Sequence, residues 1–483
     1  MNNLRLILIL VFMYQTAGSF ETGAPLHTEY LIAVPSELAI STEKLATWRE
    51  EQGLSVGIAN FEQIYSLYLG RDKEEKFRNY LISAFETGLK RCLIIGDETN
   101  SPVRIASYGY HPVDIAFCQS DLYFSDLSGE WDRDSNGVWG SFIGDRADPI
   151  SDIQVGRVPA SNTEEVDNFI LKLLAYEKGI LPSGYRYNSV LSVSVDQFVE
   201  QNNDSALSVC LPSGWTLTKL RELPSGDSPS PVFPTSSDIH SQMQMGYGWV
   251  TLFAHGRTDG ITINSAGYGN FPKTNVFTQP DLGGPLVNQT FNSIFPAVYI
   301  SASCDHGDFS SSCCGESMAE NLLFSIEGGA IVFMAHSTKG WINRSPKIVE
   351  AVYNEIPEAK NMGDIHLAGR ELLKTERMLF MSFNLYGDPQ TPIWKSDPVI
   401  YTSVLEEESE IERTEDMIAY PNPSNGSVTI VTNQPITVFN ILGQEVLRKQ
   451  PVDGKLQISN LRSGVFFAQE DITKRTKKIV IVR

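Results

Sequence analysis

Short apolar segments alternate with amphipathic ones along most of the chain, in a pattern that begins near residue 30 and starts again near residue 190. One of them, Cys92–Gly96 (CLIIG), is a continuous apolar run, as expected of a parallel strand covered on both faces. Strand–helix alternation is typical of α/β proteins with helices on both faces of the sheet. The pattern therefore predicts a doubly wound α/β structure, either as two sheets in two subdomains or as two halves of one sheet.

The expected strands are Tyr30–Val34, Ser55–Ala59, Cys92–Gly96 and Asp152–Val158 in the first run, and Val190–Val195, Trp249–Phe253, Ala297–Ser301 and Ala330–Met334 in the second. The expected helices are Thr42–Glu51, Lys73–Leu89, Thr163–Lys178, Glu316–Ser325, Lys347–Glu355 and Ile365–Thr375.

The composition changes near residue 400. Thr402–Asp416 contains the acidic run Glu406–Glu408, which is typical of a solvated linker. From Ala419 onward, short alternating segments are separated by turn signals such as Asn425-Gly426, and this predicts a small all-β sandwich. Its expected strands are Ser427–Val431, Ile436–Phe439, Lys455–Ile458, Val465–Ala468 and Lys478–Val482.

The N-terminus has the features of an export signal. Arg5 precedes an apolar run from Leu6 to Met13, and Ala17-Gly18-Ser19 supplies the small residues of a cleavage site. The run is far shorter than the roughly 20 residues of a membrane-spanning helix, which argues against an uncleaved anchor. The predicted parts are a signal peptide at 1–19, an N-terminal α/β subdomain at 20–185, a second α/β subdomain that carries the chemistry at 186–397, an acidic linker at 398–416 and a β-sandwich at 417–483.

The charge of the chain narrows the choice of partners. There are 58 acidic side chains and 38 basic ones, which gives a net charge of −20. A phosphate backbone selects basic surfaces, so this balance argues against a nucleic acid partner. An ordinary acidic protein has the same composition, and the charge alone does not indicate a function.

Six cysteines in an exported chain could form a disulfide framework. They are not spread as such a framework, however, and a chain of this length does not depend on disulfides for its stability. We therefore expect some of the thiols to be free for chemistry. The six are Cys92, Cys118, Cys210, Cys304, Cys313 and Cys314.

Three reactive residues follow predicted strands of the second run, namely Asp196, His255 and Cys304. Because the carboxyl ends of parallel strands meet at one edge of a sheet, we expect these side chains to lie close together. A thiol, an imidazole and a carboxylate are the parts of a cysteine nucleophile with its base and an orienting group. The backbone amides of Gly256 and Cys304 are candidate oxyanion donors, since Gly256 has no side chain to keep a substrate away.

Each of the three also has a simpler interpretation when it is taken alone. Cys304 can be a small buried hydrophobe, His255 a turn residue before a glycine, and Asp196 the cap of the next helix. Only their occurrence at successive strand ends favours catalysis.

The segment from Asp132 to Gly137 (DRDSNG) has the alternating oxygen ligands and the glycine of a calcium loop, with Asp132, Asp134 and Asn136 as candidate ligands. Ile143 stands where a complete EF-hand has its glutamate, so an EF-hand is excluded. An Asx-rich surface turn is the alternative.

Several motifs of the α/β part occur together in the order of a known family. They are Phe253–Gly256 (FAHG), Ser301–Phe309 (SASCDHGDF), Cys313–Glu316 (CCGE), Tyr386–Pro389 (YGDP), Ser125–Leu127, Trp131-Asp132 and Val155–Pro159 (VGRVP). On these motifs the chain shows a resemblance to gingipain-like cysteine peptidases between about residues 28 and 395. The resemblance implies a caspase-like α/β fold, a catalytic Cys304–His255 pair with Asp196 as third member, endopeptidase activity, no catalytic cofactor and structural calcium. It also implies that Trp341 walls the substrate pocket, although an ordinary core tryptophan is the alternative, and Asp204 is a candidate for the acid of that pocket.

The C-terminal part has its own set of motifs, namely Tyr420–Pro423 (YPNP), Phe439–Val446, Leu461–Phe467 and Lys477–Val480. With these segments it resembles the sorting domain of the type IX secretion system, an immunoglobulin-like sandwich. The resemblance implies that the type IX machinery is a partner and that the protein is secreted or attached to the outer cell surface. An adhesive or merely stabilising sandwich is the alternative.

Taken together, the sequence predicts a secreted cysteine endopeptidase that hydrolyses protein or peptide substrates through an acyl-enzyme on Cys304. The alternatives are a non-hydrolytic surface binding protein and a sortase-like transpeptidase that attaches exported proteins. Hydrolysis and transpeptidation share the acyl-enzyme and differ only in the acceptor, so the sequence does not separate them.

Overall fold

The chain forms two compact units, Met1–Val399 and Ile400–Arg483, each described here by itself. The predicted signal peptide and acidic linker, Asp196, Cys313 and Cys314 lie outside the residues that the computed structural model describes. The described residues are 27–109, 116–182, 184–195, 197–222, 236–264, 273–276, 295–310, 316–325, 328–372 and 374–395 in the first unit, and 418–420, 427–432, 434–440, 445–452, 454–459, 461, 464–470 and 476–481 in the second.

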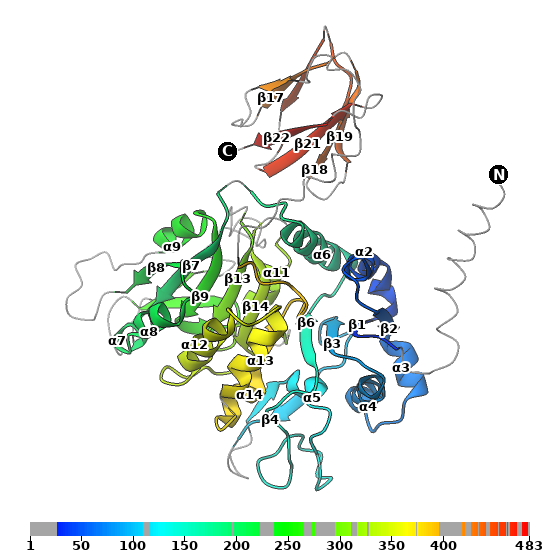
Figure 1. Ribbon diagram of the computed structural model, residues 1–483, viewed down its shortest axis with the longest axis vertical. Helices are drawn as coiled ribbons and strands as arrows, with labels where there is room; N and C mark the ends of the chain where they lie inside the picture. The colour runs from blue at the N-terminus through cyan, green and yellow to red at the C-terminus, as the bar shows by residue number, and fades with distance from the viewer. Residues whose placement is uncertain are drawn as a thin grey trace, which may run out of the picture. The chain divides into compact units, whose positions relative to one another are not determined.

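The first unit is built on one ten-stranded sheet with the strand order β2-β1-β3-β6-β15-β14-β13-β9-β7-β8 (Figure 1). Of the two arrangements that the sequence left open, the structure has two halves of one sheet rather than two sheets. The strands are β1 (Tyr30–Val34), β2 (Val56–Asn60), β3 (Arg91–Ile95), β6 (Gln154–Val158), β7 (Arg186–Ser194), β8 (Thr216–Arg221), β9 (Tyr247–Phe253), β13 (Ala297–Ser301), β14 (Ala330–His336) and β15 (Phe383–Tyr386).

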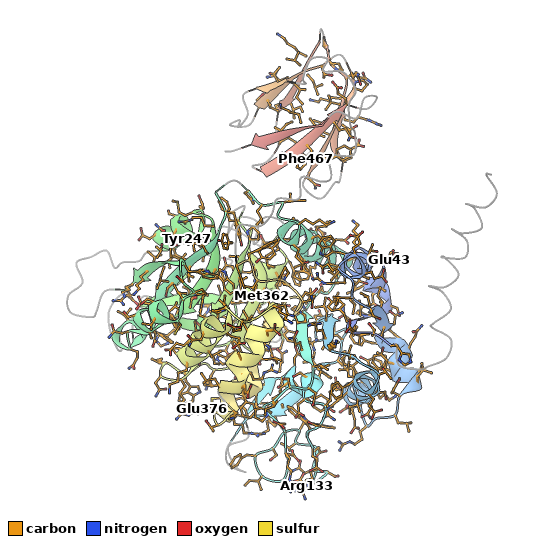
Figure 2. The ribbon with its side chains drawn as sticks, in the orientation of Figure 1. Glu43, Arg133, Tyr247, Met362, Glu376 and Phe467 are labelled. Atoms are coloured by element: carbon orange, nitrogen blue, oxygen red, sulfur yellow. The ribbon has the colours of Figure 1, made fainter. Side chains whose placement is uncertain are left out.

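The short strand β15 joins the two halves of the sheet. It runs antiparallel to β14 and parallel to β6, so the strands of the two halves point in opposite directions. The carboxyl ends of the second half therefore share an edge with the amino ends of the first. Tyr247, which begins β9, lies at the opposite end of the unit from Arg133, which precedes β6 (Figure 2).

The residues that lead into the start of β6 consequently lie at the edge where the second half ends. The hairpin of β4 (Ile105–Ser107) and β5 (Phe117–Gln119) contacts the segment that follows β14. The Ser337 hydroxyl donates to the carbonyl oxygen of Gln119 over 2.6 Å, and the Tyr108 and Thr338 hydroxyl oxygens are 3.3 Å apart. The first half therefore contributes to the surroundings of the second-half strand ends.

Both faces of the sheet are buried, as the doubly wound pattern requires. Alternate residues of β1 belong to two separate hydrophobic clusters, with Ile32 in one and Leu31 in the other. Helix α4 begins where the Asp72 carboxylate accepts from the Glu75 amide, a typical N-cap. None of the helices in the described part of the chain combines the length and apolarity that a membrane span needs. The longer helices are α2 (Ala39–Glu51), α4 (Lys73–Glu86), α6 (Thr163–Glu177), α8 (Asn203–Cys210), α12 (Ser345–Glu355) and α13 (Met362–Leu372), and shorter ones include α11 (Met318–Leu323) and α14 (Arg377–Ser382).

The second unit consists of two small antiparallel sheets, ordered β16-β17-β20 and β19-β18-β21-β22. Val428 and Ile458 from the first sheet and Val438 and Ala468 from the second share one buried cluster, so the sheets pack face to face. The prediction of an all-β C-terminal unit is confirmed, whereas the labels immunoglobulin-like and caspase-like stay predictions. The strands are β16 (Ile418–Tyr420), β17 (Ser427–Val431), β18 (Ile436–Asn440), β19 (Glu445–Lys449), β20 (Lys455–Ser459), β21 (Gly464–Glu470) and β22 (Thr476–Ile481).

Candidate active site

The strands that precede the three predicted catalytic residues are neighbours in the sheet. Strand β9 pairs in parallel with β13 on one side and with β7 on the other, so their carboxyl ends adjoin, as predicted. The Val195 amide, directly before Asp196, donates to the carbonyl oxygen of Phe253 over 2.9 Å. This bond holds the end of β7 beside the strand that leads to His255.

The backbone at Gly256 lies directly against the backbone at Cys304. A Cβ atom at Gly256 would lie 2.1 Å from the Cys304 carbonyl oxygen and 2.8 Å from the Cys304 nitrogen. Only glycine allows so close an approach. The structure thus brings together the strand β10 (His255–Arg257) and the turn that carries the candidate nucleophile.

The chain turns sharply after Cys304. Asp305 has φ of +59°, in the left-handed region that aspartate tolerates better than most residues. The turn is held by its own amides, since Asp305 donates to the Thr338 carbonyl over 2.9 Å and Gly307 donates to the His336 carbonyl over 3.0 Å. The Cys304 side chain is thereby left partly exposed at the carboxyl edge of the sheet.

The surroundings of the Cys304 thiol keep it protonated until a base acts on it. Burial raises the pKa of Cys304 above its ordinary value, while backbone groups of Gly340 and Gly256 and the charge of Lys339 act in the opposite direction. The sulfur lies 3.6 Å from the Gly340 carbonyl oxygen. A thiol with a raised pKa needs a neighbouring imidazole to form its thiolate at neutral pH.

The structure excludes the core interpretation of Trp341, because this side chain is 45% exposed. Its backbone amide donates to the Ser345 hydroxyl over 2.7 Å, and its indole Nε1–H contacts the sulfur of Met378. It directly follows Gly340, where a Cβ atom would lie 2.4 Å from the carbonyl oxygen of Ala302. Trp341 therefore lies on the surface next to the Cys304 segment.

Asp204 is not available to a substrate. Its carboxylate is fully buried and forms a two-pronged ion pair with the Arg221 guanidinium at the end of β8, the edge strand of the sheet. A carboxylate whose two oxygens already bind an arginine has little left to offer a cationic side chain. The structure therefore does not support the prediction that Asp204 is the pocket acid.

Two of the three predicted metal ligands, Asp132 and Asp134, lie in a cluster of carboxylates. One carboxylate oxygen each from Asp132, Asp134 and Asp145 lie within 4.8 Å of one another. Asn136 lies beside this cluster, since its amide donates to Asp134 over 2.9 Å and its side-chain oxygen accepts the Val138 N–H over 2.6 Å. Burial, together with the charges of the other two carboxylates, raises the pKa of Asp145. Figure 2 labels Arg133, which lies within the predicted calcium loop.

The four cysteines in the described part of the chain are free, as expected of a chain without a disulfide framework. Cys92 and Cys118 are buried, and burial raises the pKa of both thiols, which makes them poor nucleophiles. Cys210 and Cys304 are partly exposed. Cys210 therefore serves as an internal control for the reactivity of Cys304.

We expect Gly256→Ala to lower kcat/KM of any peptidase activity by about 100-fold, because the new methyl group must push β10 away from Cys304 and a displacement of about 1 Å has effects of this size. Gly53→Ala is the matched control, since Gly53 has φ of +86° but open space around it. It should cost about 1 kcal/mol of stability without changing kcat/KM. Equal kinetic losses in both variants would contradict this expectation.

Two buried histidines near this edge predict a loss of stability in acid. Burial lowers the pKa of His306 to about 4. Burial, together with the charge of the nearby His306, lowers the pKa of His336 to about 3. Between these values and the ordinary pKa of 6.5, the unfolded chain binds protons that the folded chain does not, so stability is full above about pH 6.5 and falls as the pH decreases. We expect a loss of about 2–3 kcal/mol per histidine between about pH 6.5 and 4.5, measured by urea unfolding.

The variant His336→Asn isolates one of these contributions. Nδ1 of His336 is 2.9 Å from the Ser382 hydroxyl oxygen. Because this hydroxyl already donates its hydrogen to the Met378 carbonyl, it accepts from the ring, and Nδ1 carries the hydrogen. The asparagine amide can replace this donor but does not titrate. The variant should show a weaker dependence of stability on pH, and an unchanged dependence would contradict the assignment.

A mostly parallel α/β sheet that presents a cysteine and a histidine on adjoining strand ends is the arrangement of a cysteine-type peptidase. Residues 24–394 match the model of peptidase family C25, and because this is well over half of the chain, the protein belongs to that family. The prediction of a gingipain-like cysteine peptidase is confirmed.

The fold is similar to several solved structures. These include the complex of Porphyromonas gingivalis RgpB pro- and mature domains (TM-score 0.57, 16% identity, 94% of this chain and 100% of that chain). The Arg-specific cysteine proteinase gingipain R has a TM-score of 0.55 at 16% identity, over 95% of this chain and 98% of that chain. At these identities the likeness shows the fold alone. No curated protein sequence matches the chain.

The C-terminal unit has its own match. Residues 418–482 match the model of a secretion system C-terminal sorting domain. The prediction of a type IX sorting domain is thereby confirmed, and with it export to the cell surface or the medium.

Proposed function

We propose that the protein is an exported cysteine endopeptidase in which Cys304 is the nucleophile, His255 its acid and base, and Asp196 the group that orients His255. The observation that carries the proposal is the direct contact between the Gly256 and Cys304 backbones, which joins the candidate base and nucleophile at one edge of the sheet. Membership of family C25 supports hydrolysis over the binding-protein and transpeptidase alternatives.

The reaction follows from the state of the thiol. His255 takes the Cys304 proton, and the thiolate sulfur adds to the carbonyl carbon of the peptide bond. The amides of Gly256 and Cys304 donate to the oxyanion, which is supported by the close approach of the Gly256 and Cys304 backbones. The imidazolium of His255 then protonates the leaving amine as the C–N bond breaks. Water hydrolyses the thioester with His255 again as base, which returns the free thiol.

Trp341 is proposed as a wall of the substrate pocket. Its large exposed ring beside the Cys304 segment supports this role, because aromatic side chains supply flat apolar surface for the stem of a substrate side chain. Among the described residues we assign no acid to this pocket. A panel of peptide inhibitors with different side chains would measure its charge preference.

Structural calcium is proposed at Asp132, Asp134 and Asp145, where oxygen ligands of the type that calcium prefers already converge. When bound, the ion would fix the loop before β6. Calorimetric titration of a chelated sample should show calcium uptake that is lost in Asp145→Asn. A chelated sample that takes up no calcium would remove this assignment.

Hydrolysis of a denatured protein in water enriched in ¹⁸O tests the proposed function. We expect new carboxyl termini that carry one ¹⁸O atom, because water releases the acyl-enzyme, and we expect iodoacetamide to block their formation. New peptide bonds to an added amine without ¹⁸O would indicate transpeptidation instead. An absence of any cleaved or joined product would favour the binding protein.

A further inference from the structure

His306, close to Cys304 in the sequence, has a fully buried imidazole with a partner at each nitrogen. Nδ1 is 2.8 Å from the Ser301 hydroxyl oxygen, and Nε2 is 3.1 Å from the Gly260 carbonyl oxygen. Ser301 ends β13, the strand that leads to the candidate nucleophile. Gly260 begins β11 (Gly260–Asn264), the hairpin partner of the strand that carries His255.

The protons of this group have one consistent arrangement. The Gly260 carbonyl can only accept, so Nε2 carries the hydrogen, and Nδ1 accepts from the Ser301 hydroxyl. The Ser301 oxygen in turn accepts from the Ser303 amide over 3.0 Å. Burial lowers the pKa of His306 to about 4, which keeps the ring neutral in this tautomer near neutral pH.

The ring also lies against Gly256. A Cβ atom at Gly256 would lie 2.9 Å from Nε2 of His306, in addition to its clash with the Cys304 backbone. In the hairpin, Gly256 pairs with Ile261 and Arg257 with Gly260. One side chain thus connects the end of β13, the Cys304 turn and the hairpin of His255.

We propose that His306 is a positioning residue that sets the placement of the His255–Gly256 strand relative to Cys304. The proposal rests on the proposed function, because it concerns the distance between its nucleophile and its base. His306 does not itself touch the thiol through any contact described above. It acts through the hydrogen bonds to Ser301 and Gly260, which fix the two segments to each other.

His366 is the matched control. It is also fully buried, and its Nε2 is 3.1 Å from a backbone carbonyl oxygen, that of Phe383. It belongs to α13, which packs against α12, α14, β6 and β15. Removing its imidazole should therefore cost comparable stability without changing the geometry of Cys304 and His255.

The test uses the full chain and compares His306→Phe, His306→Gln, Ser301→Ala and His366→Phe. The readouts are the thermal midpoint, kcat and KM separately, and the rate of Cys304 alkylation by iodoacetamide at pH 7. We expect His306→Phe to lower the alkylation rate and kcat by about 10- to 100-fold with KM changed by less than about threefold, since only the placement of base and nucleophile is lost.

The conservative variant should restore much of the loss. Glutamine can donate to the Gly260 carbonyl from a position near that of Nε2, so His306→Gln should keep alkylation within about tenfold of the wild type. Ser301→Ala should fall between the two variants. His366→Phe should lose thermal stability but keep the wild-type alkylation rate.

Two outcomes separate this inference from the function on which it rests. If Cys304 of the wild type reacts no faster than Cys210, the proposed function and the inference both fail. If wild-type Cys304 is activated but His306→Phe is alkylated at the wild-type rate, only the inference is overturned. Should His306→Phe not fold, wild-type alkylation rates in both His306→Gln and Ser301→Ala overturn it instead. A loss in His366→Phe equal to that in His306→Phe would also overturn it.

Discussion

Cys304→Ala should lower kcat/KM by about 10⁴-fold or more, because it removes the atom that forms the acyl-enzyme while the oxyanion donors and the binding surface remain. The side chain is partly exposed and its turn is held by backbone bonds of Asp305 and Gly307, so the free energy of unfolding should change by less than about 2 kcal/mol. Steady-state cleavage of a peptide library and urea unfolding measure the two quantities.

Cys210→Ala is the matched control for this variant. Cys210 is the other partly exposed free cysteine among the described residues, and it ends α8 rather than a central strand. Its replacement should leave kcat/KM unchanged. Full activity of Cys304→Ala, or an equal loss in both variants, would contradict the assignment of the nucleophile.

Arg49→Met is expected to have the largest effect on stability, about 3–5 kcal/mol, because it leaves two buried carboxylates without a cation. The Arg49 guanidinium is fully buried and lies 2.6 Å from Glu177 and 2.7 Å from Asp388, whose side chains are also buried. Asp388 accepts in addition from the Tyr30 hydroxyl over 2.7 Å. This network ties the ends of α2 and α6 to the segment after β15, and urea unfolding at pH 7 measures its loss.

Lys90→Met provides the surface control. Lys90 pairs with Glu29, but both side chains are well exposed, and such pairs are worth about 0–1 kcal/mol. The triple variant Arg49→Met, Glu177→Gln and Asp388→Asn should recover part of the loss, since no charge is then left buried. An Arg49→Met variant as stable as Lys90→Met would show that the network contributes little.

The strands of the fold were predictable where their apolar character is strong. Tyr30–Val34 and Ala297–Ser301 have the predicted bounds, because both strands are buried on both faces and read as continuous apolar runs. Strand β15 was not predicted, since its four residues, FNLY, carry no periodicity that distinguishes a strand. Without β15, the union of the two halves into one sheet, and their opposite directions, could not be derived.

Two of the motifs behind the family resemblance have a packing explanation that the sequence alone did not reveal. A Cβ atom at Gly156 would lie 2.3 Å from the Gly387 carbonyl oxygen, so the VGRVP and YGDP segments pack backbone to backbone. Arg157 is fully buried and paired with Asp121, as Arg49 is with Asp388. The packing of Gly156 against Gly387 joins the halves of the sheet, whereas the Arg157–Asp121 pair lies within the first half.

The candidate site was predictable to the extent that it depends on strand ends. Cys304 and His255 follow central strands, and the topology alone brings such positions together. The proposed roles of Asp145 and His306 were not predicted, because they depend on tertiary contacts with Asp132 and Gly260 that no local pattern encodes. The position of His306 close to Cys304 in the sequence is a signal that could have indicated a role for this histidine at the candidate site.

The most direct measurement is mass spectrometry of the intact protein and its peptides after treatment with a panel of peptide chloromethylketones, for the wild type and His255→Ala. We predict one adduct per chain, on Cys304, formed at a rate that depends on the peptide side chain and lost in His255→Ala. Labelling of Cys304 that is no faster than that of Cys210, or that survives the loss of His255, would contradict the thiolate–imidazole pair on which the proposed function depends.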